Sequence, residues 1–115
     1  MGVAFAAINW HAPWLVRYAA LGEAAAQQVL AGATVAQAFN HLVAQGAAPD
    51  PGVRFVPQAD LPSGMAYEQF ILERAQVPTR DNLHDFFNGL MWLHWPQTKR
   101  RMNQIHGAAV QAQGV

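Results

Sequence analysis

The sequence predicts an α+β fold that is mostly helical, with N-terminal helices, two short strands and a C-terminal helical hairpin. The first half is rich in alanine and spaces its apolar residues as a helix does. Turn residues then crowd into GAAPDPG, residues 46–52, after which β-branched and aromatic residues alternate in part. Helical spacing returns from about Leu83. A chain of 115 residues is long enough for one domain, 1–115, and too short for a second independent core.

The segment APWLVRYAALGEAAAQQVLAG, residues 12–32, predicts two successive helices. Pro13 suits a first helical turn, where its missing N–H costs nothing. Gly22 has a low helix propensity and is expected to interrupt the segment. The second helix should then stop at Gly32.

A capping box marks the start of the next helix. Thr34 is followed three residues later by Gln37, so each side chain can bind a backbone N–H that the first turn leaves free. A helix is therefore predicted over 35–45, ended by Gly46.

The middle of the chain predicts two short strands joined by the loop DLPSG. VRFVPQA, residues 53–59, forms the first, and MAYEQFILERAQV, residues 65–77, contains the second. Residues 67–74 can instead be helical, because eight residues are too few to decide between the two periods.

Two further helices are predicted after the strands. Asp81 or Asn82 can cap a helix that runs to about His94. Pro96 then forces a break and opens the last helix at its first turn, over about residues 97–107 with a weaker continuation to Gln113. Folding back at this break would make the helical hairpin of residues 82–107.

The first helix of this hairpin carries one narrow polar stripe on an otherwise apolar surface. The stripe consists of His84, Asp85, Asn88 and Trp92. An exposed amphipathic helix would have a much wider polar face, so the helix is expected to be mostly buried, with its stripe facing a cleft or another polar stripe.

The last helix supplies a matching stripe, because Lys99, Asn103 and His106 are spaced to share one face. In a regular hairpin about Pro96, residues equally far from the turn lie at the same height. This predicts three contacts: Trp92 with Lys99, Asn88 with Asn103, and Asp85 with His106.

The predicted contacts outline a candidate site. An Asp85 to His106 hydrogen bond would orient the imidazole as a general base, so the catalytic candidates are His84, Asp85 and His106. The ligand-binding candidates are Arg80, Asn88, Trp92, Lys99 and Asn103, in which the cations hold a carboxylate or phosphate and the amides a planar polar group. Such a site would bind a small anionic or polar ligand and could hydrolyse it. No serine or cysteine is placed as a nucleophile, and no cofactor can be identified.

Each of these residues also has a purely structural interpretation. Asp85 can cap the first turn, His84 can bond a backbone carbonyl, and Trp92 can belong to the core. The two asparagines can simply bond each other. A metal site of His84, Asp85 and His106 is a weaker alternative, because adjacent His and Asp point apart on a helix and the remaining ligands are not evident.

Composition excludes several function classes. Seven Lys and Arg balance seven Asp and Glu, so no global field favours nucleic acid or an anionic membrane surface. The chain has no cysteine, hence neither disulfide nor thiolate chemistry. MGVAFAAINW lacks the basic start of a signal peptide and reaches a polar residue too soon to span a membrane. We therefore expect a soluble, cytoplasmic protein.

The low fraction of charged residues also indicates self-association. Only 12% of residues are charged and 52% are hydrophobic, which leaves little polar surface to cover a monomer. We expect a homo-oligomer that buries more than about 1,000 Å². The alternative to a ligand-binding pocket is accordingly a non-catalytic interaction module that docks a partner subunit through surfaces such as Trp10, Trp14 and Trp95. Convergence of the candidate site residues on one solvent-reachable cavity would favour the pocket.

The segments LPSGMAYEQFI and VPTRDNLHDFFNGLMWLHWPQTKRRMNQIH resemble the proteobacterial domain-of-unknown-function (DUF) family numbered 3025. The resemblance covers roughly residues 10–107 and implies a bacterial protein in which this chain is the N-terminal part of a longer domain. It implies no activity. Leu83 stands where the family often has tryptophan. The matching positions are Tyr67, Glu68, Pro78, Thr79, Arg80, His84, Asp85, Phe86, Asn88, Trp92, Pro96, Lys99 and Asn103.

Overall fold

The structure, a computed structural model, describes residues 2–112 and confirms the mostly helical α+β class. In chain order its elements are α1 (Gly2–Ala6), the 3₁₀ turn η1 (Val16–Tyr18), α2 (Ala19–Leu30), α3 (Val35–Ala44), β1 (Arg54–Pro57), the 3₁₀ turn η2 (Gln58–Asp60), α4 (Tyr67–Arg74), β2 (Gln76–Thr79), α5 (Leu83–His94) and α6 (Pro96–Ala112). No helix in the part of the chain that the structure describes is long and apolar enough to cross a membrane.

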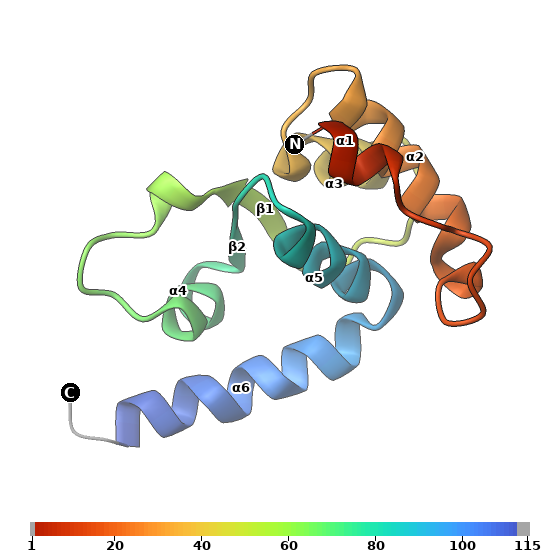
Figure 1. Ribbon diagram of the computed structural model, residues 1–115. Coiled ribbons are helices and arrows are strands. Elements are labelled where there is room, and N and C mark those ends of the chain that lie inside the picture. The colour runs from red at the N-terminus through yellow and green to blue at the C-terminus, as the bar shows by residue number, and fades with distance from the viewer. Residues whose placement is uncertain (1, 113–115) are drawn as a thin grey trace.

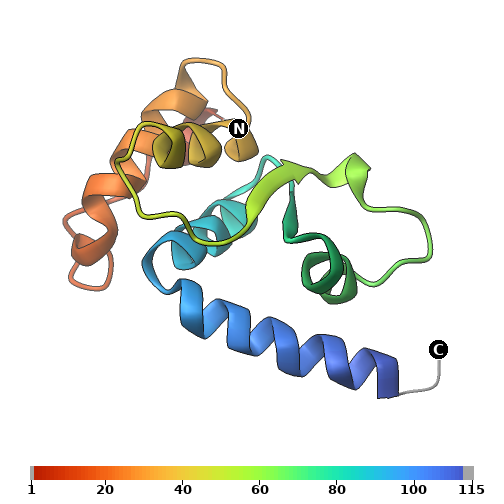
Figure 2. The same cartoon turned by 180° about the vertical axis from the view of Figure 1, so that it is seen from behind.

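Helix α5 lies at the centre of the molecule. Helices α1 to α3 lie on one side of it, and α4 with the two strands lies on the other (Figure 1). Helix α6 turns back after α5 and runs beneath both α5 and α4, as the view from behind also shows (Figure 2). The polar stripe of α5 can therefore face α4 and α6 while its apolar surface packs on the N-terminal helices.

The prediction of two successive helices over residues 12–32 is wrong, because the structure has the short 3₁₀ turn η1 followed by the single helix α2. Pro13 lies in a turn before η1 and does not open a helix, and Gly22 lies inside α2 without interrupting it. Tertiary packing explains why a glycine occupies this helical position, since a Cβ at Gly22 would overlap the indole ring of Trp10. The capping box was predicted correctly: Thr34 Oγ1 accepts from Gln37 N at 3.1 Å, and Gln37 Oε1 accepts from Thr34 N at 3.0 Å.

The two strands form a parallel pair, in which Arg54 is opposite Gln76 and Pro57 is opposite Thr79. The predicted strand over residues 67–74 is wrong, and its helical alternative is right, because this segment is α4. Two neighbouring parallel strands must be joined by a crossover that returns the chain to the end of the sheet at which the first strand began. Helix α4 lies in this crossover. It ends at Ala75, whose φ of 54° stops the helix and starts β2.

Helices α5 and α6 begin at the predicted residues. Asn82 caps α5 by accepting a hydrogen bond from Asp85 N at 2.8 Å, and Pro96 opens α6 after the single residue Trp95. Asp81, the other predicted cap, instead accepts from Val35 N at 2.8 Å and so holds the start of α3. Helix α6 includes the weaker predicted continuation as far as Ala112, the last described residue, and packs mainly on α4.

The core is built around the apolar side of α5. Phe86 has no exposed surface, and its ring centroid lies 5.0 Å from that of Phe5 and 5.4 Å from that of Phe39. Gly89, one turn later, leaves the space that the Phe39 ring occupies. This close packing fixes the rotation of α5 and so determines which residues point towards α4 and α6.

Candidate functional site

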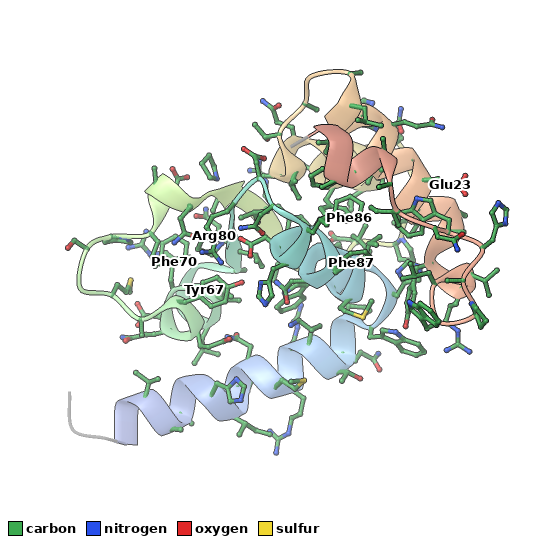
Figure 3. All side chains as sticks on the ribbon, viewed as in Figure 1. Glu23, Tyr67, Phe70, Arg80, Phe86 and Phe87 are labelled. Atoms are coloured by element: carbon green, nitrogen blue, oxygen red, sulfur yellow. The ribbon has the colours of Figure 1, made fainter. Side chains whose placement is uncertain are left out.

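A cleft of about 410 Å³ opens between α4, α5 and the end of β2. Figure 3 shows Tyr67 on α4 and Arg80 beyond β2 on one side of α5, whereas Phe86 points to the other. We call this feature the polar cleft. It is lined by Gln58, Leu61, Tyr67, Glu68, Arg80, His84, Asp85 and Asn88.

Asp85 organises the mouth of the polar cleft. Its Oδ2 accepts from Arg80 N at 2.7 Å and from Arg80 Nε at 3.1 Å, and its Oδ1 accepts from Arg80 Nη2 at 3.2 Å. His84 Nδ1 lies 3.2 Å from the same Oδ1. Burial by itself raises the pKa of the Asp85 carboxyl, but the hydrogen bonds from Arg80 and His84 outweigh it, so that the net pKa lies below its usual value. Asp85 is thus an anion that holds two cleft residues in place.

Tyr67 contributes a neutral hydroxyl group to the polar cleft. Burial raises the pKa of Tyr67 to about 12, and the nearby carboxylates of Glu68 and Asp85 add to this effect. Asn88 Nδ2 donates to the Tyr67 oxygen at 3.4 Å. The hydroxyl hydrogen is therefore free to donate to a ligand.

Asn88 connects the polar cleft to α6. Its Oδ1 accepts a hydrogen bond from Lys99 Nζ at 2.7 Å, and this ammonium lies 5.7 Å from the centroid of the Trp92 ring. Burial lowers the pKa of Lys99, although the charge of Glu68 partly opposes the shift. The contact of Trp92 with Lys99 was predicted correctly.

Glu68 is the second carboxylate of the site. Asn103 Nδ2 donates to Glu68 Oε1 and to the Glu68 backbone carbonyl, both at 2.8 Å, and His106 Nδ1 lies 3.9 Å from Glu68 Oε2. These three side chains, with Tyr67, Lys99 and Trp92, surround a small cavity of about 50 Å³. Tyr67 and Glu68 line both this cavity and the polar cleft, so the two spaces adjoin.

Two predicted contacts are wrong. Asp85 binds Arg80 and His84 and not His106, and Asn88 binds Lys99 and Tyr67 and not Asn103. The cause is the path of α6, which leaves α5 to pack on α4 and gives Asn103 and His106 the partner Glu68. The general base formed by Asp85 and His106 is therefore not assembled. His84 is the histidine that lies beside Asp85.

The predicted site residues divide between the two adjoining spaces. Arg80, His84, Asp85 and Asn88 line the polar cleft, and Trp92, Lys99, Asn103 and His106 line the small cavity. The metal alternative is not assembled, because within residues 2–112 no three histidine, aspartate or glutamate side chains come together as a cation site.

Sequence reasoning missed the α4 side of the site. Tyr67, Glu68 and Gln58 were not among its candidates, although the first two link the polar cleft with the small cavity. The available signal was the Tyr-Glu pair of the family pattern. A strand over residues 67–74 would have alternated these side chains between two faces, whereas α4 directs both to the same region.

The family model described as "Protein of unknown function (DUF3025)" matches residues 53–115, which is more than half of the chain. The match begins after α3, later than the resemblance over residues 10–107 suggested, and it includes every residue that lines the polar cleft and the small cavity. Comparisons with curated proteins and with solved structures found no match. From β1 onward, and with the whole candidate site, this chain belongs to the DUF3025 family.

Proposed function

We propose that the polar cleft binds a small polar ligand, and that this is the function of the site. The observation that carries the proposal is that Arg80 and Tyr67 are held in place by neighbouring side chains and still have hydrogen-bond donors that no protein atom uses. Asp85 engages Nε and one Nη2 hydrogen of Arg80, which leaves the Nη1 atom free, and Asn88 leaves the Tyr67 hydrogen free. The volume of about 410 Å³ falls within the usual range of small-molecule pockets.

The charges of the polar cleft narrow the ligand class. Glu68 and Asp85 are acidic, and Arg80 is the one lysine or arginine among the lining residues. A multiply charged anion would be repelled by two carboxylates, and the one guanidinium of the cleft is already hydrogen-bonded to Asp85. A neutral or zwitterionic ligand avoids this repulsion and can use the hydrogen-bonding groups of Tyr67 and Arg80, so the anionic or polar ligand expected from sequence is narrowed to this class.

Hydrolysis of the bound ligand extends the same proposal. His84 lies beside Asp85, and its side chain is 85% exposed. Its Nε2 could accept a proton from a water molecule that attacks an ester carbonyl of the ligand, while the Asp85 carboxylate stabilises the resulting imidazolium. The imidazolium would then return this proton to the alcohol that leaves when the bond between the carbonyl carbon and the ester oxygen breaks. Tyr67 or Arg80 could donate to the carbonyl oxygen.

Titration of the ¹⁵N-labelled protein with glycine, uracil and glucose tests ligand binding by NMR. We expect at least one of these compounds to shift the amides of Arg80, His84 and Asn88 in a saturable way. Tyr67→Phe removes one hydroxyl and should weaken that binding by about fivefold to tenfold, the usual loss for one neutral hydrogen bond. A reaction with glycine methyl ester in the same tube would reveal hydrolysis as free methanol.

The matched control is Tyr18→Phe, which removes the other tyrosine hydroxyl of the chain. That oxygen accepts from Trp95 Nε1 at 3.1 Å and lines no part of the polar cleft. Tyr18→Phe should bind the probe as the native protein does. The proposal fails if no compound of the panel shifts the three amides, or if the two variants bind equally well.

Self-association is a second candidate function, favoured by an apolar groove of about 400 Å³ between α1, the loop after it and α5. Trp14 lines this groove and is 75% exposed. We propose that a second copy of the chain covers it, because a net charge of zero puts no overall repulsion between two copies.

Sedimentation equilibrium at micromolar concentration tests this second candidate. We expect the native protein to be a dimer or larger, and Trp14→Ser to shift the population towards monomer. His11→Ser replaces a nearby exposed residue that does not line the groove and should leave the mass unchanged. A monomeric native protein would contradict self-association without affecting the polar cleft.

A further inference from the structure

Lys99 is the single lysine of the sequence, and it lies where the small cavity adjoins the polar cleft. Its side chain is half-buried and lines the small cavity. Its Nζ donates to Asn88 Oδ1 at 2.7 Å, and Asn88 lines the polar cleft. Lysine side chains usually extend into water, so a half-buried lysine in this position is uncommon.

The surroundings of Lys99 favour its neutral form. Lys99 makes no ion pair with a carboxylate among residues 2–112. Burial lowers its pKa, and the charge of Glu68 opposes this shift only in part. A lower pKa increases the fraction of unprotonated amine at neutral pH, and only the unprotonated amine can attack a carbonyl carbon.

A hydroxyl donor is held beside this amine by the same amide group. Asn88 accepts from Lys99 Nζ through Oδ1 and donates to the Tyr67 oxygen through Nδ2 at 3.4 Å. Tyr67 also lines the small cavity, and burial raises its pKa to about 12, so the hydroxyl keeps its proton at neutral pH. A carbonyl group in the cavity would therefore meet a nucleophile for its carbon and a donor for its oxygen.

The size and charge of the small cavity limit the carbonyl compound that it can take. Its volume of about 50 Å³ compares with about 30 Å³ for one water molecule in the liquid, so it holds a carbonyl group and little more than the carbon attached to it. Glu68 contributes a carboxylate to the wall, which disfavours an anionic compound. These limits select an uncharged aldehyde of two or three carbons.

We propose that Lys99 binds such an aldehyde covalently, as an imine. Nζ forms a bond to the carbonyl carbon, the carbonyl oxygen takes a proton from the Tyr67 hydroxyl, and Nζ returns a proton to the Tyr67 oxygen, which gives a carbinolamine. The carbon–oxygen bond then breaks. The oxygen leaves as water with a second proton from Tyr67, and Nζ loses its remaining proton as the carbon–nitrogen double bond forms. Amine and aldehyde thus give imine and water, without oxidant or reductant.

Reductive labelling with acetaldehyde and sodium cyanoborohydride tests the proposal, because the reductant converts the imine into a stable N-ethyl amine. Mass spectrometry of proteolytic peptides follows the label at Lys99 separately from the N-terminal amine. The matched control is the double variant Lys99→Arg, Arg101→Lys, which keeps the net charge and moves the lysine to an exposed position on the same helix. At neutral pH, Lys99 of the native protein should be labelled at least about tenfold faster than the relocated lysine.

Three further measurements separate a reactive site from a merely accessible lysine. In guanidinium chloride the native protein should lose the advantage of Lys99, because the cavity is unfolded. Tyr67→Phe should slow the labelling of Lys99 by about tenfold or more, whereas Tyr18→Phe should not change it, since Tyr18 lines neither space. Glyoxylate, an aldehyde that carries a carboxylate, should show less of the advantage than acetaldehyde because Glu68 repels it.

Equal labelling of Lys99 and the relocated lysine would overturn the proposal. So would a native protein that keeps the same rate in guanidinium chloride, or equal rates in the two tyrosine variants. An equal advantage with glyoxylate would overturn the restriction to uncharged aldehydes. None of these results bears on ligand binding in the polar cleft, which is measured by amide shifts and involves no covalent bond to Lys99.

Discussion

Replacement of Phe86 by alanine is expected to lower the free energy of unfolding by about 3–5 kcal/mol, the usual cost of deleting a buried ring from a packed core. Phe86 has no exposed surface. Its ring centroid lies within 6.3 Å of those of Phe5, Trp10, Phe39 and Phe87, which come from three separate parts of the chain. The cavity cannot collapse without moving all of them. Urea denaturation followed by circular dichroism measures the loss.

Trp14→Ala is the control for this prediction, because it also removes an aromatic ring but from a side chain that is 75% exposed. At a protein concentration at which the chain is monomeric, it should change the free energy of unfolding by no more than about 0.5 kcal/mol. A loss below about 1.5 kcal/mol in Phe86→Ala would show that the centre of the core lies elsewhere.

Asp85→Asn is expected to lower the free energy of unfolding by about 1–3 kcal/mol at pH 7, because the charged acceptor of three hydrogen bonds from Arg80 becomes a neutral amide. The effect should depend on pH. The pKa of Asp85 in the folded protein is below its usual value, so the stabilisation is fully present above the pKa of the unfolded state. It disappears as the pH falls through the folded pKa.

Urea denaturation of both proteins from pH 7 down to about pH 2 measures this dependence. The native protein should lose stability on acidification more steeply than Asp85→Asn, and the two curves should converge at the acid end. Asp60→Asn is the control, since Asp60 is exposed and its side chain forms no hydrogen bond within residues 2–112. Parallel curves for native protein and Asp85→Asn would contradict the role of Asp85 as the anion that holds Arg80 and His84.

The starts of α3, α5 and α6 could be predicted because their signals are local. The capping box of Thr34 and Gln37, the cap at Asn82 and the proline at the start of α6 each act on backbone groups within about one turn. A side chain that satisfies a neighbouring N–H does so in any fold that places a helix there. The same local argument identified the polar stripe of α5, because its period depends only on the helix.

Residues 67–74 and Gly22 show where local signals were insufficient. The segment YEQFILER fits a strand or a helix, and the parallel pairing of β1 with β2 decided for the helix that crosses between them. Gly22 has a low helix propensity, yet α2 continues through it because the Trp10 ring packs against the position that lacks a side chain. In both cases a contact between distant parts of the chain outweighed a preference of at most about 1 kcal/mol.

The sequence by itself identified the α5 and α6 residues of the candidate site, but the contribution of α4 and the pairings were decided by tertiary structure. Sequence periodicity selected Asn88, Trp92, Lys99 and Asn103 as inward-facing polar or aromatic residues, and each lines the polar cleft or the small cavity. Which of them meet depends on the angle between α5 and α6. That angle is set by the packing of α6 on α4 and of α5 on the aromatic core, and these interactions join residues far apart in the sequence, whose relative positions no local preference encodes.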